Sequence, residues 1–257
     1  MSSWIRQSFA SLRALIGAAR CYRPFWFFSL GLFAIDLFWI GYFVIAKGRY
    51  ELGYGPSLYF HKEMLLTTDG GHPELFGYAQ TLLLVVLFVR LLRWTRQPIY
   101  LVLGLIFLVV LLDDALQLHE VAGVYLSEEL GLPKLFGVRR RDVGEVVAYG
   151  ILGAVTLPLL VYGLFRSRAE HRGNGLAFMI PLGGLAFCAI GVDLVYRMLK
   201  DLFKAAGVLI DAIEDGGELV TITLGCLLAL GALRLYRPQA APADRSSPPS
   251  GSASADR

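Results

Sequence analysis

The segment DDALQLHE, which starts at Asp113, is the densest group of reactive side chains in this chain of 257 residues. At about 100° per residue, Asp113, Gln117 and Glu120 share one face of a regular helix. Asp114 and His119 point elsewhere, so these side chains surround one ion only if the helix breaks. Carboxylates beside an imidazole suit a hard or borderline divalent metal, or a proton relay. We therefore predict Asp113, His119 and Glu120 as metal ligands; the alternative is a helix end whose charges simply reach water.

A second acidic segment, IEDGGEL at residues 213–219, leads into an apolar run. Asp211, Glu214 and Glu218 are spaced to share one helical face. Asp215 with a glutamate three residues later is also the pattern of a capped helix start, and the glycines between them suit the entry of that helix. The pattern predicts a helix that begins near Asp215, with Glu218 able to face the same site.

Several charged residues are candidate partners of these segments. Glu145 opens another apolar run, and with Glu218 it is the candidate general base or ligand partner. Asp193 and Arg197 are four residues apart and are predicted to pair along one helix, with Arg197 as the candidate contact for an anionic group. Three consecutive arginines at 139–141 support the main alternative to metal binding. Salt bridges between loops and helices would neutralise the acidic side chains without any ligand.

Two histidines and one aspartate outside these segments add further alternatives. His61 and His72 would join His119 in a three-histidine zinc site, although their spacing matches no metal signature. Asp36 lies in the middle of the first apolar run. An ionisable group at that depth is costly, and it is usually a protonated, hydrogen-bonded carboxyl or the coupling residue of a transporter.

The elements that must position these side chains are membrane-spanning helices. Hydrophobic residues make up 56% of the chain, only 18% of residues are charged, and the mean hydropathy is +0.57. This composition is too apolar for a soluble globule of this length. Continuous apolar runs of about twenty residues are what a bilayer core requires of a helix. We predict an all-α, polytopic membrane helix bundle with about six transmembrane helices near 25–46, 75–94, 98–117, 145–165, 175–197 and 217–236.

Once these spans are placed, seventeen of the twenty-one carboxylates fall on one side of the membrane. Arginine-rich short loops at 90–96 and 166–174, together with the basic N-terminus, predict that the other side is the cytoplasm. Both termini are then cytoplasmic, in a multi-pass protein of the cell (inner) membrane. Carboxylates that project from helix ends at one level are expected to line a common vestibule. These are Glu74, Asp113, Asp114, Glu145, Asp193 and Glu218.

The chain divides into three parts. Residues 1–22 place apolar side chains three and four apart with arginines on another stripe, which predicts an amphipathic helix at the cytoplasmic interface. Residues 23–237 form the predicted six-span membrane domain. Residues 238–257 are rich in Pro, Ser and Ala and hold almost no apolar anchors, so we predict a disordered cytoplasmic tail.

Two pairs of small residues predict where membrane helices approach one another. Gly150 with Ala154 lies in the fourth predicted span, and Gly225 with Ala229 lies in the sixth. Because these positions carry no large side chains, neighbouring backbones can come close there.

Three short blocks carry a resemblance: DGGHPELFGYAQ (69–80), DDALQLHE (113–120) and IEDGGELVTITLG (213–225). Together they resemble a set of uncharacterised bacterial multipass membrane proteins. The resemblance implies a membrane protein without a known activity, so it assigns no role to any residue. Hydrolases related to alkaline ceramidases and progestin receptors also place Asp, Ser and His around zinc in a helical bundle, but their His-x-x-x-His pair is missing from this chain.

The function classes follow from these patterns. The chain has no P-loop, no Rossmann glycine fingerprint and no Gly-x-Ser-x-Gly motif, and its net charge of +3 gives no sign of nucleic-acid binding. The leading hypothesis is an integral membrane protein whose extracytoplasmic carboxylate–histidine site binds a divalent metal. A hydrolase or oxidase that acts on a lipid-like substrate would fit it. The alternatives are a cation- or proton-coupled transporter or channel, and a structural or sensory membrane subunit.

Overall fold

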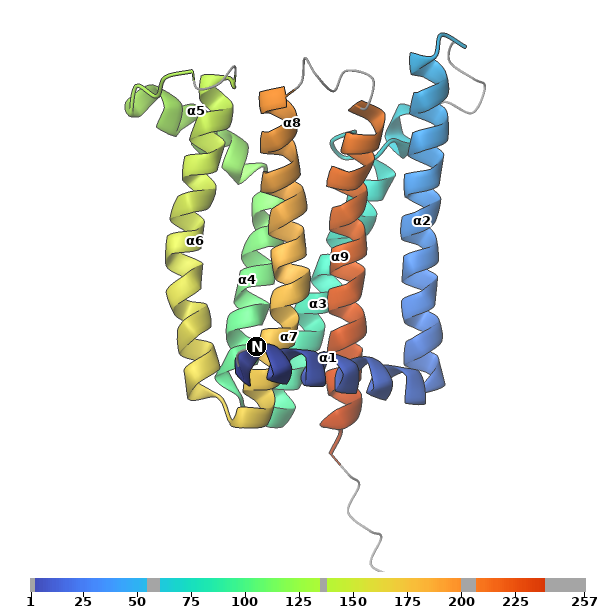
Figure 1. Ribbon diagram of the computed structural model, residues 1–257, viewed down its shortest axis with the longest axis vertical. Coiled ribbons are helices and arrows are strands. Elements are labelled where there is room, and N and C mark those ends of the chain that lie inside the picture. The colour runs from blue at the N-terminus through green and yellow to red at the C-terminus, as the bar shows by residue number, and fades with distance from the viewer. Residues whose placement is uncertain (1–2, 55–60, 135–137, 200–206, 239–257) are drawn as a thin grey trace, which may run out of the picture.

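The computed structural model describes residues 3–54, 61–134, 138–199 and 207–238 (Figure 1). The predicted tail 238–257 lies outside them except for its first residue. The regular elements of the described residues are helices, which confirms the predicted all-α bundle. Six helical runs are long and apolar enough to cross a membrane, as predicted. They are α2 (Arg23–Glu51), α3 (His72–Thr95), α4 (Pro98–Ala115), α6 (Arg140–Arg166), the run Ala169–Arg197 and α9 (Gly207–Leu235).

The fifth span is built from consecutive pieces of different helical geometry. It begins as α7 (Ala169–Ala186), passes through the π-helical turn η2 (Phe187–Val192) and ends as α8 (Asp193–Leu199). Single π-helical turns inside α-helices are rare and occur frequently at functional sites. The remaining elements are α1 (Ser3–Cys21), η1 (Lys62–Met64) and α5 (Leu118–Glu129).

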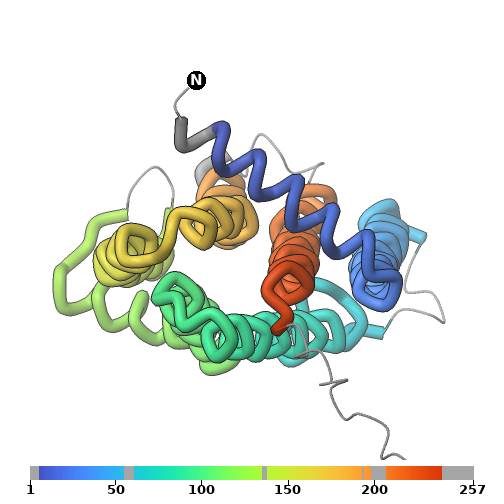
Figure 2. Tube along the Cα trace, turned by 90° about the horizontal axis from the view of Figure 1, so that it is seen from below, coloured from blue at the N-terminus to red at the C-terminus, as the bar shows by residue number. Residues whose placement is uncertain are grey.

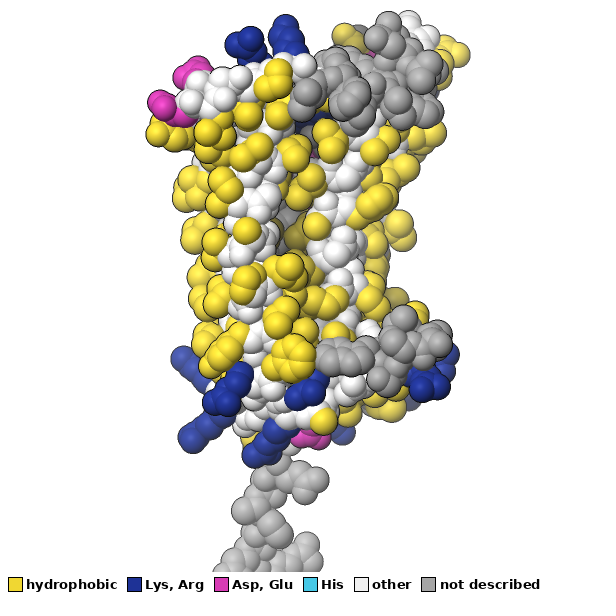
Figure 3. Space-filling model, turned by 60° about the vertical axis from the view of Figure 1, so that its left-hand side comes forward, with side chains coloured by type: hydrophobic (Ala, Val, Ile, Leu, Met, Phe, Trp, Pro, Cys, Tyr) yellow, Lys and Arg dark blue, Asp and Glu magenta, His cyan; other side chains and the backbone are white. Residues whose placement is uncertain are grey.

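The bundle has two chemically different ends. The acidic end carries α5, η1 and the first residues of α3, α6 and α9, whereas the basic end carries α1 and the last turn of α9 (Figure 1). The N-terminal helix and the end of the last span therefore lie together, as an even number of crossings requires. Figure 3 shows Lys and Arg side chains gathered at the basic end, below a surface that is mostly hydrophobic. That the basic end is cytoplasmic, and that the membrane is the inner one, stay predictions.

The predicted N-terminal amphipathic segment is confirmed as a helix, and α1 runs across one side of the bundle near its basic end, alongside the lower parts of α7 and α9, to the start of α2 (Figures 1 and 2). Two glycines allow this close fit. A Cβ at Gly231 of α9 would overlap the backbone carbonyl of Leu15, and a Cβ at Gly173 of α7 would overlap the hydroxyl of Ser11. Leu15 is fully buried against the bundle, so α1 is packed onto the spans and is not a loose appendage.

α9 is the central helix, whereas α6 lies at the periphery (Figure 2). In the most apolar stretch of each helix, 67% of the residues of α9 are buried inside the protein, against 11% for α6. Gly225 lies against Leu84 of α3, and Ala229 is fully buried, so the close packing predicted for this pair is confirmed. The other predicted pair is wrong: Gly150 is exposed, and an added Cβ there would meet nothing within 4 Å. α6 therefore turns most of its surface outward.

Candidate functional site

A pocket of about 810 Å³ opens at the acidic end, between α3, α4, α6, the fifth span and α9. We call it the acidic pocket. Charged side chains line it where the helices reach the end of the bundle, and deeper positions on the same helices make an apolar floor. The floor includes Ile106 and Val110 of α4, Leu152 of α6, Leu182 and Leu185 of α7, and Ile222 of α9.

The acidic pocket gathers carboxylates from five separate helices. Glu218 comes from α9 and Glu145 from α6, and Arg197 of α8 lines the pocket beside them. The side chain of Asp193 lies outside the described residues. The predicted site carboxylates that line the pocket are Glu74, Asp113, Asp114, Glu120, Glu145 and Glu218.

The chain breaks its helix within the segment DDALQLHE, as a shared site requires. Between α4 and α5, Gln117 takes a left-handed conformation with φ of 51°, which is uncommon for any residue but glycine. The break turns the chain so that Nδ1 of His119 lies 3.2 Å from Oδ2 of Asp113. The His119 ring also stacks on Tyr149 of α6, with 5.3 Å between the ring centres. Asp113 and His119 therefore form an oriented pair in the pocket wall.

The His119–Asp113 pair predicts a stability that depends on pH. The hydrogen bond to Asp113 raises the pKa of His119 above its ordinary value of 6.5, and burial opposes this only in part. Because the folded pKa is the higher one, the stabilisation is complete below the unfolded value and is lost as pH rises through the folded pKa. We expect the unfolding temperature in detergent to fall over that window, and this component of the fall to disappear in His119→Gln. Identical pH profiles for the two proteins would contradict the pairing.

Arg141 links α5 to α6 through two carboxylates. Its Nε donates a hydrogen bond of 2.9 Å to Oε1 of Glu145, and its Nη2 pairs with Glu120. Glu145 is only 8% exposed, so its charge is almost removed from water and depends on a basic partner. Glu120 is likewise held by an arginine.

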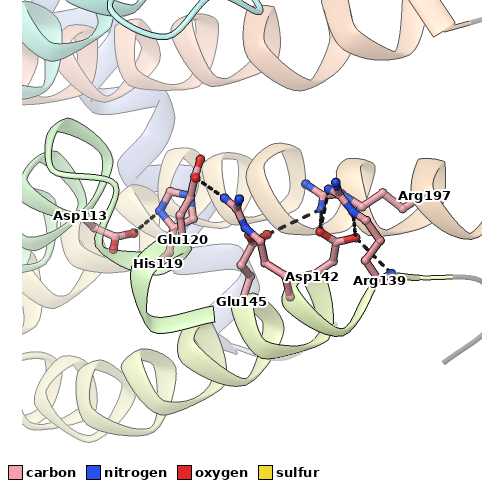
Figure 4. Close-up of polar contacts among 8 residues, drawn as sticks. Asp113, His119, Glu120, Arg139, Asp142, Glu145 and Arg197 are labelled. Atoms are coloured by element: carbon pink, nitrogen blue, oxygen red, sulfur yellow. Dashed lines mark hydrogen bonds and ion pairs between the residues drawn. The ribbon is translucent and has the colours of Figure 1, made fainter. Parts of the chain in front are cut away.

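Arg197 carries the same network from α6 to α8 (Figure 4). It pairs with Asp142, and its Nη1 lies 3.7 Å from Oε2 of Glu145. Asp142 is 4% exposed and also accepts hydrogen bonds from the backbone N–H and the guanidinium of Arg139. The arginines at the start of α6 thus neutralise part of the acidic face, as the salt-bridge alternative holds. The predicted pair of Arg197 with Asp193 involves a side chain outside the described residues.

On the wall of the pocket formed by α3, α4 and α9, two carboxylates differ from those of α6. Asp114 and Glu218 are half-buried and close enough to interact electrostatically. Within the described part of the chain, neither makes a hydrogen bond or an ion pair with a basic side chain. Glu74 beside them accepts hydrogen bonds from the hydroxyl of Tyr78 and the backbone N–H of Gly70. Carboxylates that lie close together in a half-buried site without a basic partner are unfavourable when ionised, so a bound cation would stabilise their charged forms.

The predicted metal ligands form pairs and not a triad. In the ranges that the structure describes, no three His, Cys, Asp or Glu side chains are arranged to hold a metal ion. Glu120 is engaged by an arginine, while Asp113 and His119 engage each other. His61 and His72 are exposed and do not line the pocket, so the three-histidine site gains no support. Metal binding stays a prediction.

Asp36 lies in a separate polar contact between three spans. Its side chain is fully buried in α2 and accepts a hydrogen bond of 2.9 Å from Nε2 of Gln80 in α3. The same amide donates to Thr223 of α9 over 2.7 Å. Such hydrogen bonds hold membrane helices together. Asp36 is not among the residues that line the acidic pocket, so the predicted role on a transport path receives no support.

The predicted helix start at Asp215 is wrong. α9 begins at Gly207, so Asp215 lies inside a continuous helix and caps nothing. The two glycines that follow it serve packing: Cβ atoms at Gly216 and Gly217 would overlap side chains of α2 and η2 respectively. Because the helix runs on past the glycines, it presents Glu218 and the acidic residues of the preceding turns to the pocket.

One polar cluster, at the basic end, is missing from the sequence predictions. Nδ1 of His171 lies 3.1 Å from the hydroxyl of Tyr100, and Asn174 donates to that hydroxyl over 3.2 Å. All three side chains are almost completely buried. Nearby arginines make this segment look like a short cytoplasmic loop, whereas α7 already begins at Ala169. The signal that was available is the apolar run that follows without interruption.

The comparisons with known proteins give a family and no activity. One family model matches residues 31–232, which is more than half of the chain, and its description is a domain of unknown function (DUF8692). The matched range includes every span except the first residues of α2 and the last turn of α9. No curated protein and no solved structure matches the chain.

Proposed function

This chain belongs to the DUF8692 family, and we propose that it is an integral membrane protein that binds a lipid-like molecule with a positively charged head. The observation that carries the proposal is the acidic pocket, which joins a surplus of carboxylates to an apolar floor within the spans. Pockets of about 300 to 1,000 Å³ are the usual size for small-molecule ligands. An amphiphile with a cationic head would contact the carboxylates of the acidic pocket with its head and the apolar floor with its alkyl part.

The charge of the pocket favours a cationic head. Ten carboxylates line it, against three Lys or Arg side chains, in the part of the chain that the structure describes. Those three, Lys47, Arg139 and Arg197, already pair with carboxylates. Asp114 and Glu218 therefore lie in a half-buried site with no basic partner among the described residues, where their ionised forms are unfavourable unless a cation binds. A bound ammonium group would supply that partner.

The size of the pocket favours an organic cation over a bare metal ion. Carboxylate ligands hold a divalent ion at about 2.0 to 2.6 Å, so a metal site is far smaller than this volume. An apolar floor also offers nothing that a metal ion can bind. It offers a suitable surface to the alkyl part of an amphiphile.

Removing the charges of Asp114 and Glu218 together is expected to weaken the binding of dodecylamine by about a hundredfold, since each is a charge-assisted contact. The variant is Asp114→Asn with Glu218→Gln, measured by equilibrium binding of the radiolabelled amine in nanodiscs. The matched control is Glu128→Gln with Glu129→Gln, because these two carboxylates are exposed on α5 outside the pocket lining. Wild-type protein that binds dodecanoate as well as dodecylamine would refute the charge assignment.

Filling the pocket is expected to block binding without disturbing the fold. Gly153 lines the pocket, and an added Cβ there would meet nothing within 4 Å. We expect Gly153→Phe to weaken dodecylamine binding by about tenfold or more while the unfolding temperature is kept. Gly150→Phe is the control, since Gly150 has the same open surroundings on the same helix but does not line the pocket. An equal loss in both variants would mean that the pocket is not the binding site.

A metal-dependent enzyme that acts on such a molecule is a second candidate, and the His119–Asp113 pair favours it. A carboxylate that holds one ring nitrogen orients a histidine for metal binding or proton transfer. His119, Asp113 and Glu120 would bind the ion, and Glu145 or Glu218 would accept the proton. Mass spectrometry of purified protein tests this: stoichiometric metal that is lost in His119→Ala supports the enzyme. A metal-free wild type contradicts it.

A further inference from the structure

The acidic pocket continues sideways between α6 and the upper part of the fifth span. The acidic pocket is lined there by Leu152 and Gly153 of α6 and by Ala186 and Ala189 of the fifth span. A second pocket of only about 20 Å³ extends it toward the acidic end. Val146 of α6 and Leu194 of α8 are apolar residues of this extension, whereas the ion-paired Asp142, Glu145 and Arg197 form its charged edge. Figure 3 shows the protein surface hollowed between two columns of largely hydrophobic side chains on this side. We call this passage the side opening.

The side opening is framed above and below by contacts. At the acidic end, Arg197 of α8 bridges to Asp142 and Glu145 of α6 (Figure 4). Toward the basic end the helices close up, because a Cβ at Gly175 of α7 would lie only 2.8 Å from the side chain of Leu164 in α6. Between these two contacts, α6 and the fifth span face each other across the pocket. The passage is therefore a feature of the packed fold.

The surroundings of the side opening identify what reaches it. Both helices that border it are among the six membrane-spanning runs, so its outer edge faces the bilayer. Val146, which lines the smaller pocket, is exposed, and so are Gly153 of α6 and Ala186 of α7, which line the acidic pocket on facing helices. A water-soluble ligand gains nothing from an apolar opening that faces lipid. An alkyl chain that is already in the membrane can pass through such an opening without leaving an apolar environment.

We propose that the ligand enters the acidic pocket sideways from the bilayer, between α6 and η2. Its charged head reaches Asp114 and Glu218, and its alkyl chain lies along the apolar floor and extends toward the bilayer through the side opening. This inference rests on the proposed function and names the substrate class of the same site: a cationic amphiphile drawn from the leaflet at the acidic end. The ion pairs of Arg197 close the opening above the head, so the chain does not need to cross the charged rim.

Val146→Trp tests the route by placing a bulky side chain in the side opening. We expect the variant to slow both association and dissociation of radiolabelled dodecylamine in nanodiscs by about tenfold and to leave its Kd nearly unchanged, which is the signature of an obstructed passage. Butylamine, which is water-soluble and enters from the acidic end, should bind the variant at the wild-type rate. Val155→Trp is the matched control, because Val155 is exposed on the same helix and lines neither pocket.

The outcomes separate the route from the proposed function. If wild-type protein binds neither amine, the proposed function fails, and the route fails with it. If wild-type protein binds both and Val146→Trp changes neither rate for dodecylamine, the ligand enters from the acidic end and only the route is overturned. Equal slowing by Val155→Trp, or equal slowing of butylamine, also overturns it. Selective slowing of dodecylamine by Val146→Trp alone supports entry from the bilayer.

Discussion

Gly144→Val is expected to separate α5 from α6 and to abolish ligand binding in the acidic pocket. A Cβ at Gly144 would overlap the backbone carbonyl of Gly123 in α5, and backbone atoms cannot swing aside as a side-chain end can. α5 must therefore move, and Arg141 then loses the geometry that joins Glu120 to Glu145. Overpacking alone costs typically about 1–3 kcal/mol, and the broken ion pairs of a buried carboxylate add to it. Thermal unfolding and dodecylamine binding in nanodiscs measure both effects.

The control for this variant lies on the same helix. Gly150→Val introduces the same side chain where nothing lies within 4 Å of the new Cβ, so it corrects for the change in helix propensity. We expect it to unfold and to bind as the wild type does. A Gly144→Val protein with the wild-type unfolding temperature would mean that α5 is not packed on α6 through these glycines.

Asp142→Ala is expected to destabilise the protein by about 3 kcal/mol, because it removes a buried carboxylate that is paired with both Arg139 and Arg197. Asp142 joins α6 to α8 through Arg197 and caps the start of α6 through Arg139. Its removal deprives Arg197 of a partner at the rim of the pocket and opens the upper frame of the side opening. The free energy of unfolding in detergent is the direct measurement.

Two further variants separate the contributions of Asp142. Asp142→Asn keeps an acceptor for the backbone N–H of Arg139 but removes the charge, so we expect a loss between the wild type and the alanine variant. Glu129→Ala removes an exposed carboxylate of α5 and is expected to change stability by less than about 0.5 kcal/mol. A loss of the same size in Glu129→Ala would mean that total charge, and not the buried network, determines stability.

The spans were predictable because lipid imposes a composition that the sequence must display. The predicted helix boundaries are wrong where one helix changes from an apolar to a charged composition. The last span was expected to begin at 217, yet α9 begins at Gly207, because the acidic residues of its first turns face a pocket and not lipid. The same error produced the wrong cap at Asp215. The sequence does not reveal the cavity that these carboxylates face. Carboxylates in the interior of the helix were therefore interpreted as its start.

The site was predictable in its residue types but not in its pairing. The position of carboxylates at helix ends predicted a common vestibule. The predicted carboxylates whose side chains the structure describes do line one pocket. No glycine or proline marks the break at Gln117, so the His119–Asp113 contact depends on tertiary packing of α5 against α6. Asp142 lies three residues after Arg139, a capping spacing that the sequence shows, but its partner Arg197 comes from a different span. Partners between spans follow only from the arrangement of helices.

The position of α1 has a consequence for biogenesis. α1 is synthesised before the six spans, yet the surface that receives Leu15 includes Gly231, near the end of the last span. This side of α1 must therefore stay undocked until α9 has been inserted. The docking of α1 is thus a late step of assembly that can be completed only once the last span is in place.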